Sequence, residues 1–135
     1  METDPVLLHI KHLLSLGEGI RIEYKKARTR LPENIFETIC AMLNRDGGDI
    51  LLGVDDSGNV LGIDNQSIEN IKTNLVNLSN NHQKLEPPFI LFPDEHTIND
   101  LKILHISIPA SSQVHKTNGF VFDRSNDGDF RVTEP

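Results

Sequence analysis

The stretch that most constrains the fold runs from residue 37 to residue 63 and reads ETICAMLNRDGGDILLGVDDSGNVLGI. Apolar residues recur at the helical period over residues 35–43, so this stretch begins inside an amphipathic helix. Gly47 and Gly48 then end the helix, because glycine tolerates the positive φ that a helix C-terminus often needs. Residues 50–54 (ILLGV) have no polar face, which predicts a central strand buried on both sides.

An acidic turn follows this strand. Residues 55–59 (DDSGN) have the composition of a tight turn, and residues 60–63 (VLGI) are expected to return as a hairpin partner of the central strand. The helix, the central strand and the hairpin are therefore predicted to form the core of the domain.

The remaining elements are read from the same two periodicities, 3.6 residues for helices and two for strands. Asp4 and Pro5 predict the start of a helix, and Gly17 predicts its end. Further helices are expected over residues 33–44 and about 67–80. Strands are expected over residues 20–25, 89–92, 101–108, 120–124 and 130–132, with turns at residues 99–100 and 125–128. This order predicts an α+β domain with a mixed sheet and about three helices.

Length and composition fit one globular domain over residues 1–135, with 37% hydrophobic and 24% charged residues. No apolar run approaches the roughly 20 residues needed to span a bilayer, and the acidic N-terminus does not resemble a signal peptide. Cys40 is the single cysteine, so no internal disulfide forms, and its place on the apolar stripe of a helix predicts a buried thiol. We expect a cytoplasmic protein without a membrane partner.

The net charge of −7 argues against indiscriminate nucleic-acid binding, which depends on cationic surface. Basic residues nevertheless gather locally. The candidate phosphate-contacting set joins a basic segment to three residues of the tail: Lys25, Lys26, Arg28, Arg30, His115, Lys116 and Arg124. The alternative interpretation of the basic segment is a solvated loop of charge.

Two pairs of carboxylates could form a catalytic or metal site. Glu18 stands at the entry to the first expected strand and Glu23 in its middle, and Asp55 and Asp56 follow the central strand. If the two strands are neighbours, these acids converge at one edge, where clustered carboxylates bind Mg²⁺ or Mn²⁺ and support phosphodiester cleavage. In the alternative interpretation, Glu23 forms surface ion pairs and the two aspartates only shape a turn.

Other catalytic signatures are absent from the sequence. It contains no phosphate-binding G-x-x-x-x-G-K-[ST] loop, no G-x-G-x-x-G after a strand and no G-x-S-x-G elbow. One cysteine excludes a cysteine-based zinc cluster. The six histidines show no ligand spacing, so each is expected to be a surface or structural residue: His9, His12, His82, His96, His105 and His115.

Three stretches, in this order, resemble the Schlafen AlbA-type domain family. Glu18-x4-Glu23-Tyr24-Lys25 is similar to the family's E-x4-E-[FY]-K. Residues 39–48 (ICAMLNRDGG), continuing into LLGVDD and a G-x-x-x-G, are similar to its central pattern. His115-Lys116 followed by residues 120–124 resembles its terminal hairpin.

The resemblance implies an α+β domain, commonly the N-terminal, DNA-binding part of a longer bacterial transcriptional regulator. The abrupt end after a strand agrees with a further C-terminal domain. In vertebrate Schlafen proteins, a similar domain carries a three-carboxylate, metal-dependent ribonuclease site. The resemblance places Glu18 and Glu23 in that site, with Asp55 or Asp56 as the third carboxylate.

Three hypotheses follow. The leading one is a DNA- or RNA-binding module of a transcriptional regulator. The second is a metal-dependent endoribonuclease that uses Glu18, Glu23 and Asp55 or Asp56 with Mg²⁺ or Mn²⁺. The third is a protein interaction or dimerisation domain, which the negative charge favours. Under any of the three hypotheses, exposed strand edges are compatible with a homodimer.

Overall fold

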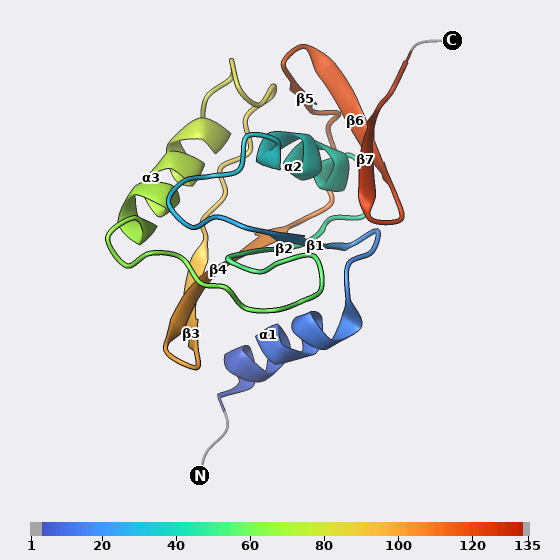
Figure 1. Ribbon diagram of the computed structural model, residues 1–135. Coiled ribbons are helices and arrows are strands. Elements are labelled where there is room, and N and C mark those ends of the chain that lie inside the picture. Colours follow the sequence, from blue (N-terminus) through green and yellow to red (C-terminus); the bar gives the residue numbers. More distant parts are fainter. Residues whose placement is uncertain (1–3, 134–135) are drawn as a thin grey trace.

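The computed structural model describes residues 4–133, which contain three helices and seven strands (Figure 1). The helices are α1 (Pro5–Leu16), α2 (Ile35–Leu43) and α3 (Ile68–Ser79). The strands are β1 (Ile22–Lys25), β2 (Gly48–Leu52), β3 (Asp94–Ile98), β4 (Leu101–Ile108), β5 (Lys116–Thr117), β6 (Phe120–Ser125) and β7 (Gly128–Arg131). The predicted α+β class, with three helices and a mixed sheet, is confirmed. No helix of the described part is long and apolar enough to cross a membrane.

The main sheet has four strands in the order β1-β2-β4-β3. β1 pairs with β2 in parallel, and the other two pairings are antiparallel. β2 lies inside the sheet, and its residues Ile50, Leu51 and Leu52 are completely buried. The prediction of a central strand buried on both sides is therefore confirmed.

Helices cover both faces of this sheet: α1 lies on one side, and α2 and α3 lie on the other (Figure 1). Alternate side chains of a strand point to opposite faces, so β2 contributes to two apolar layers. Ile50 and Leu52 join the layer under α2 and α3. Leu51 joins the layer under α1, together with Ile10 and Leu13.

Helix α1 begins and ends where the sequence predicted. The Asp4 carboxylate accepts a hydrogen bond from the backbone N–H of Val6, and Gly17 follows the helix with a φ of 81°. The Tyr24 hydroxyl donates to the Leu13 carbonyl at 2.6 Å and accepts from the Gly17 N–H at 3.1 Å. This one side chain of β1 therefore anchors the C-terminal end of α1 on the sheet.

The predicted hairpin partner of β2 does not form. Residues 60–63 make one isolated bridge, between Val54 and Val60, and no strand. Both edges of β2 are occupied, by β1 on one side and β4 on the other, so no edge is left for the returning chain. The N–H groups of Leu61 and Gly62 instead both donate to the carbonyl of Gly53.

The strand expected over residues 89–92 is also wrong. This segment runs along the end of α3, where the Phe89 N–H donates to the Ser79 carbonyl and the Leu91 N–H donates to the Ser79 hydroxyl. The partner of β4 is β3, which lies directly before it in the chain. The two strands are joined by Asn99 and Asp100, whose φ values of 50° and 66° belong to the left-handed region that tight hairpin turns require.

A second sheet, in the order β5-β6-β7, packs beside α2 (Figure 1). Asn44, at the end of α2, holds this tail in place. Its amide nitrogen donates to the carbonyls of His115 and Phe122, and its amide oxygen accepts from the His115 N–H at 2.7 Å. The expected strands over residues 120–124 and 130–132 correspond to β6 and β7.

Candidate functional site

An open cleft of about 490 Å³ lies beside β1. Its walls carry four carboxylates and two lysines, and the lining residues are Glu18, Glu23, Tyr24, Lys25, Lys26, Pro32, Asn34, Asp56 and Asp127. Because β1 and β2 are parallel neighbours, the segments that follow them leave the sheet at the same end, where both strands have their carboxyl ends. Lys25 ends β1 and Lys26 follows it. This arrangement brings both lysines close to Asp56, which follows β2.

Glu18 and Glu23 form the buried side of this cleft. The Glu23 side chain is only 10% exposed, and Glu18 accepts a hydrogen bond from the Tyr24 N–H at 3.2 Å. Burial raises the pKa of Glu23 to about 8, and its hydrogen bond with Glu18 adds to this shift, against the opposing charges of Lys25 and Arg124. Near neutral pH the Glu23 carboxyl therefore keeps its proton in the folded chain.

Arg124 does not belong to the nucleic-acid-contacting surface, contrary to the sequence expectation. It is 1% exposed. Its guanidinium lies 3.4 Å from Glu23 and 2.8 Å from Asp129, and it also donates to the carbonyls of Gly19 and Ile22. With these partners the guanidinium fastens β6 to the start of β1, and no phosphate can reach it.

His115 is likewise a structural residue and not a phosphate contact. The side chain is completely buried. Its Nδ1 lies 2.7 Å from the Pro87 carbonyl oxygen, and its Nε2 lies 2.7 Å from the Ser111 hydroxyl. A carbonyl only accepts, so Nδ1 carries the proton and Nε2 accepts from Ser111.

The other predicted basic residues lie at the surface. Lys25 ends β1 and donates to the Asn34 side chain at 3.1 Å. Lys26 and Arg30 are exposed, and the Arg28 side chain is 83% exposed despite an ion pair with Asp64. Lys26, Arg28 and Arg30 lie on the connection between β1 and α2, directly after Lys25. Lys116, on β5, lines a different hollow of the second sheet.

The two aspartates after β2 have different environments. Asp55 accepts hydrogen bonds from the N–H groups of Ser57 and Asn59 and from the Asn59 amide, and these bonds lower its pKa. Both of its oxygens are thus used in shaping the turn. Asp56 is exposed and lines the cleft, so Asp56, in place of Asp55, faces Glu18 and Glu23.

Sequence reasoning missed Asp127, which the turn between β6 and β7 brings to the cleft from far along the chain.

Sequence reasoning also missed a cluster of side chains outside the cleft. Within residues 4–133, the three side chains with donor atoms all within 4.8 Å of one another are His9, Asp49 and His105. No local spacing connects residues so far apart in the sequence, so no motif could have revealed either feature.

The chain is similar to a known protein family in sequence and to two solved structures in fold. The family model described as "Schlafen, AlbA_2" matches residues 18–133. The chain is similar to the crystal structure of the DIP2311 protein from Corynebacterium diphtheriae, with a TM-score of 0.67 and 13% identity, over 93% of this chain and 26% of that one. It is also similar to the solution structure of the N-terminal domain of a DNA helicase RecG-related protein from Nitrosomonas europaea, with a TM-score of 0.65 and 20% identity, over 100% of this chain and 92% of that one. No curated protein sequence matches the chain.

Proposed function

The chain belongs to the Schlafen AlbA_2 family, and from this premise we propose that it is the nucleic-acid-binding module of a transcriptional regulator. The observation that carries the proposal is the basic connection between β1 and α2, which borders the cleft. Lys26, Arg28 and Arg30 are exposed there, so their charges are available to phosphates. In this proposal the module binds DNA or RNA, forms a homodimer and is followed by a C-terminal regulator domain.

Physical chemistry favours weak, phosphate-directed binding with little base readout by this segment. Flexible cationic side chains on a loop contact phosphates and position the duplex, whereas sequence is read by side chains that reach base edges. Each neutralised phosphate releases bound counterions, so affinity falls steeply as salt is added. The acidic remainder of the surface repels nucleic acid and confines binding to this loop.

The test is fluorescence anisotropy with labelled duplex DNA and single-stranded RNA at low and high salt. We expect salt-sensitive binding that Lys26→Gln weakens and Lys11→Gln leaves unchanged, because Lys11 is also exposed but lies on α1, outside the basic loop. Equal weakening by both variants would mean that net charge alone matters. Absence of binding at low salt would contradict the proposal and leave an interaction or dimerisation domain.

A metal-dependent ribonuclease is the second candidate, because the cleft joins Glu18, Glu23 and Asp56 to Lys25 and Lys26. Carboxylate oxygens are the donors that Mg²⁺ and Mn²⁺ prefer, so these acids fit such an ion in chemistry. When bound, the ion would supply Lewis-acid stabilisation of phosphoryl charge. Glu23 must release its proton to hold a cation, so binding should tighten as the pH rises.

The distinguishing measurement is cleavage of labelled RNA with Mg²⁺, with Mn²⁺ and with EDTA. The nuclease hypothesis requires cleavage that EDTA abolishes and Glu23→Gln removes, with Glu86→Gln, a change at an exposed acid outside the cleft, as the control. Cleavage that persists in Glu23→Gln would rule out the carboxylate site. Binding without cleavage would leave the first proposal standing alone.

A further inference from the structure

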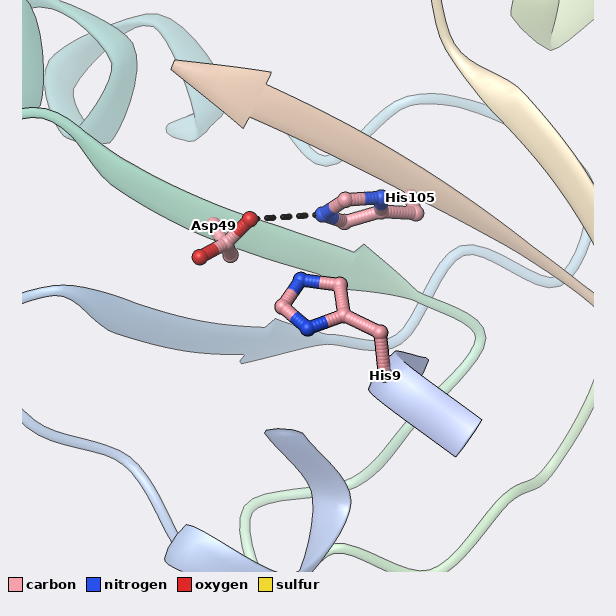
Figure 2. Close-up of side chains that lie close together, drawn as sticks. All are labelled: His9, Asp49 and His105. Atoms are coloured by element: carbon pink, nitrogen blue, oxygen red, sulfur yellow. Dashed lines mark hydrogen bonds and ion pairs between the residues drawn. The ribbon is translucent and has the colours of Figure 1, made fainter. Parts of the chain in front are cut away.

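We propose that His9, Asp49 and His105 form a binding site for a divalent late transition metal such as Zn²⁺, separate from the cleft. Figure 2 shows the three side chains facing one another between α1 and the sheet. His9 comes from α1, Asp49 from β2 and His105 from β4, and their donor atoms all lie within 4.8 Å of one another.

The register of the sheet explains why these residues meet. Asp49 and Leu51 are two residues apart on β2, so they share a face, and Leu51 belongs to the layer covered by α1. Leu51 pairs with His105 across the antiparallel ladder, which puts His105 on that face as well. His9 precedes Ile10, a residue of α1 that is buried in the same layer.

The distances suit a small ion. Nε2 of His105 donates to Oδ1 of Asp49 at 2.7 Å. Two ligands of tetrahedral Zn²⁺, each about 2.0–2.1 Å from the ion, stand roughly 3.3 Å apart. The His105–Asp49 pair therefore has to open by only about 0.6 Å, and the ion takes the place of the proton between them. His9 supplies a third ligand from the helix.

The donor set selects the class of metal. Imidazole nitrogens suit Zn²⁺, Ni²⁺, Cu²⁺ and Fe²⁺, whereas Mg²⁺ and Ca²⁺ prefer oxygen donors only. The site is open on one side: His9 is exposed, the Asp49 side chain is 24% exposed and the His105 side chain is 9% exposed. The ion can thus enter from solvent and keep water in its remaining position.

His96 on β3 adjoins the cluster. Its ring centroid lies 6.3 Å from that of His105, and its buried Nε2 has no hydrogen-bond partner among the described residues.

A metal in this site would fasten α1 to two strands of the sheet. Helix α1 otherwise rests on the sheet through a few apolar side chains and the Tyr24 hydroxyl. It also precedes residue 18, where the segment matched by the family begins. Metal binding would therefore stabilise the packing of α1, which lies outside the matched residues 18–133.

The test measures the melting temperature of the tag-free, EDTA-treated chain with and without added Zn²⁺. At free Zn²⁺ about 100 times its dissociation constant, the wild-type melting temperature should rise on the order of 10 °C. His9→Ala removes a ligand from an exposed position, so the variant should fold normally. It should bind Zn²⁺ more than about 100-fold more weakly, because even the loss of a residue that only hydrogen-bonds a metal ligand lowers affinity by about 10–100-fold.

His12→Ala is the matched control, because His12 is exposed on the same helix and lies outside the cluster. It should keep the full Zn²⁺ response, and calorimetric titration should give one Zn²⁺ per wild-type chain. The proposal is overturned if Zn²⁺ does not stabilise the wild type. It is equally overturned if His9→Ala binds Zn²⁺ as tightly as the wild type does.

Discussion

Arg124 shows how burial assigns the role of a charged residue. Its guanidinium pairs with the carboxylate of Asp129, whose side chain is only 12% exposed, so removal of the guanidinium leaves that charge without its partner. We expect Arg124→Met to lower the free energy of unfolding by about 3–5 kcal/mol, measured by urea denaturation at pH 7. Arg30→Met, at an exposed arginine, should change it by less than about 0.5 kcal/mol. Loss of nucleic-acid binding in a fully stable Arg124→Met would return this residue to the phosphate-contacting set.

Glu23 makes stability depend on pH. Its pKa is raised from 4.5 to about 8 in the folded chain, so between these values the folded state holds a proton that the unfolded state has released. This contribution is fully present below pH 4.5 and is lost as the pH rises through 8. The free energy of unfolding should therefore fall across this window, by at most about 1.4 kcal/mol per pH unit from this group.

Glu23→Gln should remove the part of the pH dependence of the free energy of unfolding that Glu23 contributes. Urea denaturation at about pH 5, 7 and 8.5 measures this pH dependence. The difference between variant and wild type isolates Glu23, because the histidines titrate in both proteins. Glu86→Gln should follow the wild-type curve. Parallel curves for Glu23→Gln and wild type would show that the Glu23 carboxyl titrates as it does in water.

At the scale of elements, the turn between α2 and β2 is where backbone geometry is most demanding. Gly47 has a φ of 75°, and a Cβ there would collide with the carbonyl oxygen of Ile108 on β4. We expect Gly47→Ala to destabilise the fold by about 2–5 kcal/mol, from the left-handed conformation and the collision together. Gly19→Ala should be nearly neutral, because a Cβ at Gly19 meets no atom within 4 Å. Thermal unfolding of the two variants tests this, and equal melting temperatures would contradict it.

Elements were predictable where their own residues decide them. Helix α1 has its N-cap, proline and closing glycine in sequence, and β4 begins and ends at the predicted residues 101 and 108. The expected strand over residues 89–92 failed because two backbone N–H groups of this segment found partners on Ser79 of α3. Those partners are supplied by another element, so the apolar pattern of the segment carries no trace of them.

At the scale of the whole molecule, a chain with a net charge of −7 carries an exposed basic loop. If that loop binds phosphates, Lys26→Gln/Arg28→Gln/Arg30→Gln should reduce the slope of log affinity against log salt by about 2 to 3 for duplex DNA. The triple variant Lys11→Gln/Arg21→Gln/Arg131→Gln makes the same change in net charge at other exposed positions. Anisotropy across a salt series compares them, and an unchanged slope in the first variant would place the phosphate contacts elsewhere.

The sequence by itself determined the three helices, the buried central strand, the basic loop and the α+β class. Each of these follows from residues that are neighbours in the chain, through periodicity, capping or turn chemistry. The buried thiol of Cys40 belongs here too, because its place on the apolar stripe of α2 determines its burial, which raises its pKa to about 12.

Tertiary structure alone decided the neighbours of β2, the burial of Arg124 and His115, and the choice of Asp56 over Asp55 at the cleft. It alone brought His9, Asp49 and His105 together from three elements. The physical reason is common to all of these features. They depend on contacts between residues far apart in the chain, and such contacts leave no period or spacing in the sequence from which they could be predicted.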